Sequence, residues 1–220
     1  MTSPTPPSPE TAVVIIAKTR MGQNLCIGAV RVDQRQGRCL RLLPAQNTKY
    51  RSWSDFKPAV GDVIKGRLTP CPQAEPPHTE DHILADGWTQ AGHMKSARHL
   101  VSKFCEVWKG GRDSLFDGTL HWSNAGGGRI PKGARLPDGS VGFWELPAPA
   151  KKELHNEKVK YRIDLGANSV LVPFVGEERE QLPDVLPAGT IARMSLSRWW
   201  KPPGHDEDAC WLQLSGYYTD

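Results

Sequence analysis

The C-terminal segment of residues 190–218 restricts the possible folds more than any other part of the sequence. Two runs of alternating apolar and polar residues, 190–200 and 210–218, flank Lys-Pro-Pro-Gly at 201–204, which is a strong turn signal. Because side chains alternate across a β-strand, every second residue of each run lies on one face. The pattern therefore predicts a β-hairpin with one buried face.

The two faces of this predicted hairpin differ in chemistry. The apolar face is predicted to be core and holds Ala192, Met194, Leu196, Cys210, Leu212 and Leu214. The other face holds Arg193, Ser195, Ser197, Trp199, Trp211, Gln213, Ser215 and Tyr217. Aromatic rings, small polar groups and arginine suit stacked bases and phosphates. The alternative is that the large rings cover a neighbouring loop or helix, since each ring hides much apolar surface.

Glycine and proline are frequent throughout the chain. The 21 glycines and 19 prolines among 220 residues favour many short strands joined by turns, as in a small barrel or sandwich. Further strands are predicted at 11–19, 25–33, 38–43, 60–68, 140–146, 158–165 and 169–175. One helix is predicted at 91–108 from an apolar stripe at helical spacing, formed by Met94, Ala97, Val101, Phe104, Cys105 and Trp108.

These elements divide the chain into four parts. Residues 1–10 are rich in Pro, Ser and Thr and are predicted to be disordered. A first all-β unit is predicted at 11–88 and a second at 140–220, with the helix and a Gly-rich connection at 89–139 between them. The sequence thus predicts two similar all-β halves around one helix.

Charge and cysteine content narrow the class of protein. The net charge is +4 and the isoelectric point is near 8.8, a mild basic bias that is compatible with nucleic acid. The five scattered cysteines form no Cys-x-x-Cys pair, which favours reduced thiols over a disulfide framework. The N-terminus lacks the apolar run of a signal peptide, and no segment has the apolar length of a membrane span. We therefore expect a cytoplasmic protein that does not enter the membrane.

A row of basic residues, Lys158, Lys160 and Arg162, shares one face of a predicted strand. Three like charges in a row repel one another, and a phosphate backbone would offset that repulsion. The alternative is an exposed face whose lysines discourage pairing of strand edges. Weaker basic clusters are Arg31, Arg35, Arg38 and Arg41 in the first half and Arg112, Arg129, Lys132 and Arg135 in the Gly-rich connection.

One cluster suggests a metal site or a catalytic site. The sequence His-Thr-Glu-Asp-His at 78–82 holds two histidines four residues apart and two adjacent carboxylates, which are groups used in both kinds of site. The surrounding prolines favour extended chain, where adjacent side chains point to opposite sides, so neither interpretation is favoured. The sequence also lacks a nucleophile elbow and a phosphate-binding loop motif. We therefore predict no enzyme activity, no metal and no cofactor.

Several segments together resemble one known family. They are Ile-Ile-Ala-Lys-Thr-Arg at 15–20, Cys-Ile-Gly-Ala-Val at 26–30, Cys-Leu-Arg-Leu-Leu-Pro at 39–44 and Pro-Pro-His-Thr-Glu-Asp at 76–81. The ending, Leu-Ser-Arg-Trp-Trp at 196–200 with Cys-Trp-Leu-Gln-Leu-Ser-Gly at 210–216, is the most specific. The pattern resembles the bacterial dual OB-containing domain family over residues 11–218.

The resemblance implies a mainly β fold of two OB-like small barrels in tandem, bridged by one α-helix, and a nucleic-acid-binding role. With the hairpin face, it predicts binding of single-stranded nucleic acid, with DNA preferred over RNA. The residues predicted to bind are Lys158, Lys160, Arg162, Arg193, Arg198, Trp199, Trp200, Trp211, Gln213 and Tyr217. Three alternatives stay open: an adaptor whose aromatic face binds protein, a sensor of a nucleotide or other small ligand between the barrels, and a metal-dependent nuclease that uses His78, Glu80, Asp81 and His82.

Overall fold

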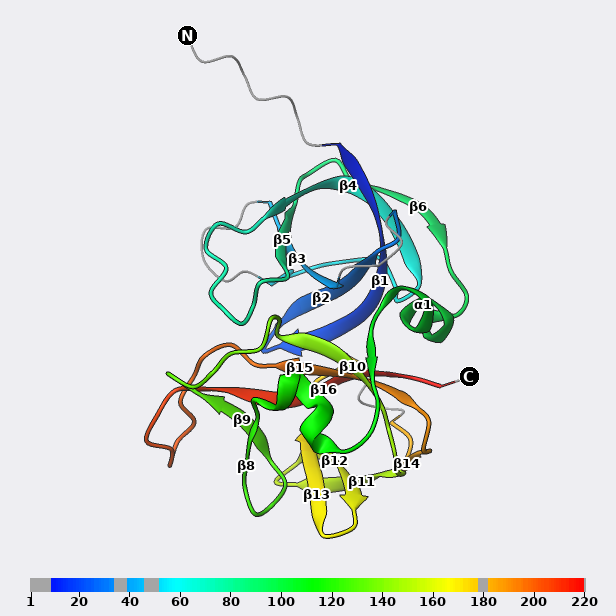
Figure 1. The fold of residues 1–220 in the computed structure, drawn as a ribbon. Helices are drawn as coiled ribbons and strands as arrows, with labels where there is room; N and C mark the ends of the chain where they lie inside the picture. Colours follow the sequence, from blue (N-terminus) through cyan, green and yellow to red (C-terminus); the bar gives the residue numbers. More distant parts are fainter. Residues whose placement is uncertain (1–8, 34–38, 46–51, 178–181, 220) are drawn as a thin grey trace.

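Two β-rich halves stack on each other in the computed structural model, which describes residues 9–33, 39–45, 52–177 and 182–219 (Figure 1). The chain is mainly β, as predicted. Of the segment predicted to be disordered, residues 1–8 lie outside the described residues, and Glu10 already begins the first strand. The predicted basic residues Arg35 and Arg38 also lie outside the described residues.

The first half is a closed barrel. Its strands are β1 (Glu10–Met21), β2 (Asn24–Arg31), β3 (Cys39–Pro44), β4 (Asp62–Pro70), β5 (Asp81–Leu84) and β6 (Thr89–His93). They follow the order β1-β2-β3-β5-β4-β6, and an additional pairing of β1 with β4 closes the first five into a barrel, while β6 pairs with β4 alone. Its core is a cluster of apolar side chains that includes Ile15, Ile27 and Leu42, all without solvent exposure.

Strand β1 is buried on both of its faces, which explains its unbroken apolar run. Val13 and Ile15 point into the first barrel, whereas Ile16 belongs to a separate cluster between the two halves. A register shift between Ile15 and Ala17 accompanies this change of partner. A continuous apolar run is what a strand covered on both sides requires.

The second half wraps two sheets around one core. The six-stranded sheet has the order β7 (Val107–Trp108), β10 (Val141–Glu145), β15 (Ile191–Leu196), β16 (Ala209–Tyr218), β9 (Gly128–Pro131) and β8 (His121–Trp122). The four-stranded sheet has the order β13 (Asn168–Pro173), β12 (Lys158–Leu165), β11 (Ala150–His155) and β14 (Val185–Leu186). Trp144 and Tyr161 are the largest fully buried side chains of the core. The predicted closing hairpin is confirmed as β15 and β16, which pair antiparallel.

The connection between the halves is more structured than the sequence predicted. Helix α1 (Ala97–Phe104) is shorter than the predicted 91–108, because β6 occupies the preceding residues and Ser96 caps the helix by accepting from the His99 backbone N–H at 3.2 Å. A 3₁₀ element, η1 (Arg112–Gly118), follows. The predicted Gly-rich connection contains strands that were not predicted, since β8 and β9 form a hairpin that extends the second sheet.

Helix α1 and a small apolar cluster hold the two halves together. The cluster joins Ile16 and Val30 of the first barrel to Val101 of α1 and to Phe143 and Tyr218 of the second half. The buried Tyr218 hydroxyl donates to the Ile16 carbonyl oxygen at 2.7 Å. Figure 1 shows α1 beside this junction. The predicted bridging by one α-helix is therefore confirmed.

No helix in the described part of the chain is long and apolar enough to cross a membrane. All five cysteines are free thiols. The Sγ atoms of Cys39 and Cys105 lie 4.0 Å apart, where β3 meets the end of α1. The fold is thus held by its cores and its polar contacts without a disulfide.

Candidate nucleic-acid interface

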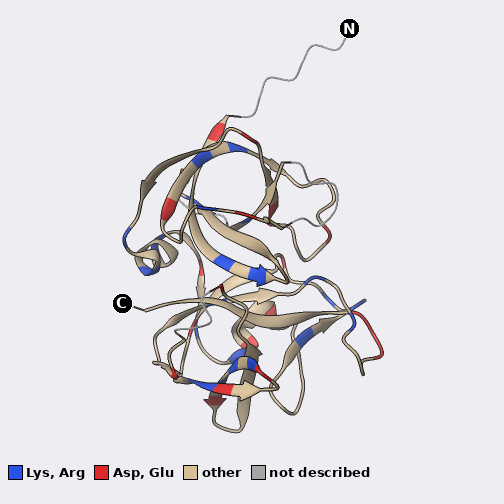
Figure 2. Cartoon of the chain, turned by 180° about the vertical axis from the view of Figure 1, so that it is seen from behind, with Lys and Arg blue, Asp and Glu red and all other residues tan. Residues whose placement is uncertain are grey.

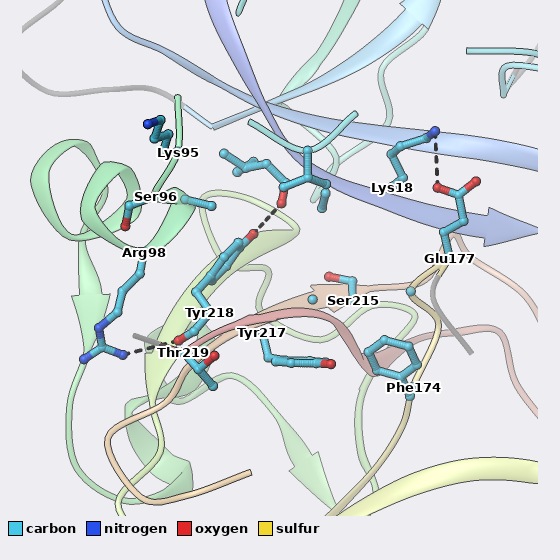
Figure 3. Close-up of a pocket in the computed structure, with 16 residues that line it drawn as sticks. Lys18, Lys95, Ser96, Arg98, Phe174, Glu177, Ser215, Tyr217, Tyr218 and Thr219 are labelled. Carbon is cyan, nitrogen blue, oxygen red and sulfur yellow. Dashed lines mark hydrogen bonds and ion pairs between the residues drawn. The ribbon is translucent and has the colours of Figure 1, made fainter. Parts of the chain in front are cut away.

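A β-bulge in the closing hairpin divides the face that the sequence predicted to bind. Arg193 pairs with Gly216 and Met194 pairs with Leu214, so Ser215 is an extra residue. A bulge reverses the side-chain alternation beyond it. Tyr217 consequently turns to the core of the second half, where its ring lies 6.2 Å from that of Phe174 (Figure 3). The prediction that Tyr217 shares the face of Trp211 is wrong.

The first barrel covers much of the remaining face. Arg193 is only 5% exposed, and Ser195 and Ser215 are buried as well. The prediction that Arg193 lies on an open surface is therefore wrong. Alternation along a strand separates two faces, but it does not distinguish a face in solvent from a face that packs on another barrel.

The predicted basic row on β12 lies elsewhere in the molecule. Tyr161 and Ile163 of β12 point into the same core as Met194 and Leu212 of the hairpin, but from the other sheet. The outward faces of the two sheets therefore point away from each other. Lys158, Lys160 and Arg162 do not join the hairpin residues in one platform, and Figure 2 shows Lys and Arg spread over both halves.

An acidic residue offsets the charge of this row within the protein. Glu153 pairs in register with Lys160 and accepts from Arg162 through both carboxylate oxygens, at 2.5 and 3.3 Å. These hydrogen bonds, with a further one from His155, lower the pKa of Glu153 to about 2. A phosphate backbone is not needed to stabilise this strand.

Four of the predicted residues, Arg193, Arg198, Trp200 and Gln213, line a cleft of about 180 Å³ between the two barrels. The charged side chains that line it are all arginines: Arg20, Arg41, Arg193 and Arg198. Its lining among the described residues includes no carboxylate. We call this site the arginine cleft. Its uniform positive charge makes it selective for anions.

Two carboxylates that are not part of the cleft lining, Asp81 and Glu80, neutralise part of this charge. Asp81 accepts from Arg41 Nε and, at 2.6 Å, from Arg198 Nη2. Glu80 accepts from the backbone N–H of Ser140 at 3.2 Å and from its hydroxyl. Burial alone would lower the pKa of Arg41, but nearby anionic groups, including Asp81 and Glu80, outweigh it and hold that pKa above its ordinary value.

Arg193 is a buried arginine of the cleft that no carboxylate contacts in the described structure. Its Nη1 donates to the Ser215 hydroxyl at 2.7 Å, while its buried Nε has no hydrogen-bond partner among the described residues. Its Nη2 lies 2.7 Å from where a Cβ on Gly28 would stand, so the absence of a side chain there makes room for it. Gly28 pairs across β2 and β3 with Arg41, whose buried Nη2 also lacks a hydrogen-bond partner in the described structure. Gly28 thus brings the two guanidinium groups to one place.

Trp200 stands at the mouth of the arginine cleft and is 48% exposed. Its carbonyl oxygen accepts from Trp211 Nε1 at 3.3 Å. Trp211 lines a second groove of about 540 Å³, where the Arg129 guanidinium lies 5.5 Å from its ring centroid and His205 lies against it at 4.6 Å. Asp206 and Glu207 also line this groove, and Glu207 pairs with Arg129 at 3.5 Å. The groove therefore adds aromatic surface beside the cleft, with its arginine already paired.

Trp199, which was predicted to bind nucleic acid, instead makes structural contacts. Its Nε1 donates to the Pro76 carbonyl oxygen at 2.9 Å, and its ring packs against the core of the second half. The segment of residues 76–81 is thereby fixed to the closing hairpin. We therefore do not expect Trp199 to stack on a base, because its Nε1 is already hydrogen-bonded and part of its ring is already packed.

The histidine cluster does not converge on one point. His78 is fully buried with its Nε2 4.0 Å from Cys210 Sγ, and burial together with Arg41 and Arg198 lowers its pKa to about 2. His82 instead places Nδ1 3.0 Å from the Glu80 carbonyl oxygen. No group of three or more potential metal ligands forms within the described ranges. Glu80 and Asp81, the residues of the acid–base alternative, already bind Ser140 and the arginines.

A family model described as the dual OB-containing domain matches residues 11–217. The chain belongs to this family. The two barrels, their strand content and the bridging helix of this dual OB-containing domain agree with that assignment. Two of the segments that resemble the family meet at the junction, since residues 76–81 contact residues 196–200 through Pro76 and Asp81.

Two solved structures resemble this dual OB-containing domain remotely. The structure described as the p204 HINb domain has a TM-score of 0.39 and 12% identity, and the match covers 96% of this chain and 95% of that chain. The structure described as the Ifi202 HINa domain in complex with 20bp dsDNA has a TM-score of 0.34 and 11% identity, over 95% of this chain and 92% of that one. Scores this low do not extend the DNA binding of that complex to this protein. A search of curated protein sequences gave no match.

A third cavity, of about 480 Å³ and therefore larger than the arginine cleft, lies on the α1 side of the junction (Figure 3). Lys18 pairs there with Glu177 at 3.2 Å, and Arg98 donates to the Gly189 and Tyr218 carbonyl oxygens. Because its charges are mixed and largely engaged, this cavity is less selective for anions than the arginine cleft. We therefore take the arginine cleft as the centre of the candidate interface, with the groove beside Trp211 as an adjoining aromatic surface.

The sequence identified only part of this interface. Arg193, Arg198, Trp200, Trp211 and Gln213 were predicted from the hairpin, although Arg193 was expected on an open surface. Arg41 was predicted only as a member of a weak basic cluster. The sequence signal for its role in the cleft was the acidic pair Glu80 and Asp81, which follows the prolines at 76 and 77.

Proposed function

We propose that this protein binds single-stranded nucleic acid along a path from the groove beside Trp211, over Trp200, into the arginine cleft. The observation that carries the proposal is the composition of the cleft, which offers four arginines and no carboxylate among its described lining residues. Guanidinium groups bind phosphate oxygens strongly and in defined geometry. The exposed Trp200 at its mouth supplies a stacking surface for a base.

The dimensions favour a single strand over a duplex. A cleft of about 180 Å³ admits one phosphate group with its ester oxygens, whereas a duplex presents its phosphates on a broad cylinder that cannot enter. Gln213 at the mouth can hydrogen-bond the edge of an unpaired base. Stacking and hydrogen bonding to base edges both require bases that are not already paired.

We also propose a preference for DNA over RNA. The cleft wall includes Ile27, Val141, Val175 and Leu196, none of which has a polar side chain. A ribose that contacts such apolar groups would lose part of the hydration of its 2′-hydroxyl. Deoxyribose carries no such penalty.

We propose a binding protein that acts without catalysis, in the cytoplasm. The carboxylates of Glu80 and Asp81 and the neutral His78 ring are engaged in holding the two halves together, which supports a structural role for them. The five free thiols fit a reducing compartment.

Fluorescence anisotropy with labelled single-stranded DNA, single-stranded RNA and duplex DNA, each over a salt series, tests the proposal. We expect salt-sensitive binding in the order single-stranded DNA, single-stranded RNA, duplex. No binding to any of the three at low salt and micromolar protein would contradict the proposed function.

A further inference from the structure

The arginine cleft holds more positive charge than its own carboxylates neutralise. Among the described residues, the four arginines that line it face two carboxylates, Glu80 and Asp81, which leaves an excess of two positive charges. Arg193 is the buried part of this excess, since no carboxylate in the described structure contacts it, whereas Arg20 is exposed to water. Buried cations are normally paired, so this arrangement indicates a site for an anion.

The size of the cleft restricts what that anion can be. Its volume of about 180 Å³ is below the ~300–1,000 Å³ of pockets that enclose whole small molecules. A phosphate group fits, whereas a complete nucleotide does not. The attached nucleoside would remain at the mouth, where Trp200 is half-exposed and able to stack on its base.

The depth of Arg193 distinguishes the end of a strand from its middle. Arg193 is 5% exposed and lies against Gly28 on the wall of the first barrel, whereas Trp200 lies at the opening. A phosphodiester within a strand carries a nucleoside on both sides, and both would have to pass the opening for its oxygens to reach Arg193. A terminal phosphomonoester enters end-on with only one nucleoside behind it.

The excess positive charge of the cleft also favours a terminal phosphomonoester. A phosphomonoester carries about −1.5 to −2 charges at neutral pH, which matches the excess of two in the cleft, whereas a phosphodiester carries one. We infer that the arginine cleft binds a terminal phosphomonoester of the single strand, so that the protein recognises phosphorylated strand ends. This inference rests on the proposed function.

The test compares three DNA strands of one sequence that carry the fluorophore on an internal base. One has a 5′-phosphate, one a 3′-phosphate, and one has hydroxyls at both ends. We expect wild-type protein to bind one phosphorylated strand at least tenfold more tightly than the hydroxyl-ended strand. Equal binding of all three strands within twofold would overturn the inference.

Two variants that each remove one positive charge test whether the gain from a terminal phosphate arises in the arginine cleft. Arg193→Gln removes the guanidinium of the cleft, and Lys158→Gln removes a charge from the exposed outer face of β12. The gain from a terminal phosphate should fall below threefold in Arg193→Gln and persist in Lys158→Gln. A full gain in folded Arg193→Gln would contradict the assignment. If that variant does not fold, the wild-type comparison decides alone.

The same experiment separates this inference from the proposed function. If the hydroxyl-ended strand binds with salt sensitivity and a phosphate adds nothing, the inference fails and the proposed function stands. If no strand binds at all, both fail. A deoxynucleoside monophosphate that competes as well as the phosphorylated strand would show a site for free nucleotides, and end recognition would then be wrong.

Discussion

Arg198 donates from Nη2 to Oδ2 of Asp81 at 2.6 Å, although the two residues are 117 positions apart and belong to different halves of the molecule. Asp81 is 2% exposed and also binds Arg41 of the first barrel. One buried carboxylate therefore fixes both the junction and two arginines of the cleft.

Asp81→Asn should destabilise the protein strongly. Removing one partner of a buried ion pair leaves the other charge uncompensated, at a cost of about 3–5 kcal/mol. Urea unfolding at neutral pH measures the loss. Asp33→Asn is the control, because the Arg31–Asp33 pair is far more accessible and should contribute about 0–1 kcal/mol. A loss below 1 kcal/mol for Asp81→Asn would show that the shared carboxylate does not hold the junction.

Glu153 should make stability depend on acid pH. Its pKa is about 2 in the folded protein against an ordinary value of 4.5, so its stabilising contribution is complete above pH 4.5 and is lost as the pH falls toward 2. The contribution is at most about 1 kcal/mol, since the carboxylate is accessible to water. Urea unfolding of wild type and Glu153→Gln at pH 7, 4 and 3 checks this. The two proteins should converge at low pH, and a difference independent of pH would refute the assigned cause.

Trp200→Ala should weaken binding of single-stranded DNA about 5- to 150-fold, because base–aromatic stacking contributes roughly 1–3 kcal/mol per base. The unfolding midpoint should stay unchanged, since the ring is 48% exposed. Anisotropy titration measures the affinity. Tyr217→Phe is the control, because that ring packs toward the core and its substitution should leave the affinity within twofold.

Arg20→Gln should change the salt dependence of binding. Arg20 is exposed and lines the cleft, so it can contact a phosphate of the strand. The slope of log affinity against log salt should fall in magnitude by roughly 0.7, the value for one phosphate contact on a single strand. Lys158→Gln should leave the slope unchanged, and the opposite pattern would place the strand on β12.

The fold was largely predictable because most of the longer strands are alternating or continuous apolar runs that are bounded by glycine or proline. The strands that were missed, such as β7 (Val107–Trp108) and β14 (Val185–Leu186), have two residues each and carry no periodicity. The candidate site was predictable only in part. The alternation that placed Arg193 and Tyr217 beside Trp211 is broken by the bulge at Ser215, and no local pattern shows that a second barrel covers a strand face.

Photochemical cross-linking tests the central claim most directly. Single-stranded DNA that carries 5-iodouracil at successive positions would be irradiated in complex with the wild-type protein, and the cross-linked peptides identified by mass spectrometry. We predict cross-links in the peptides that contain Trp200 and Trp211, beside the arginine cleft. Cross-links confined to the peptide that contains Lys158 and Arg162 would contradict the account, because they would place the strand on the opposite side of the second half.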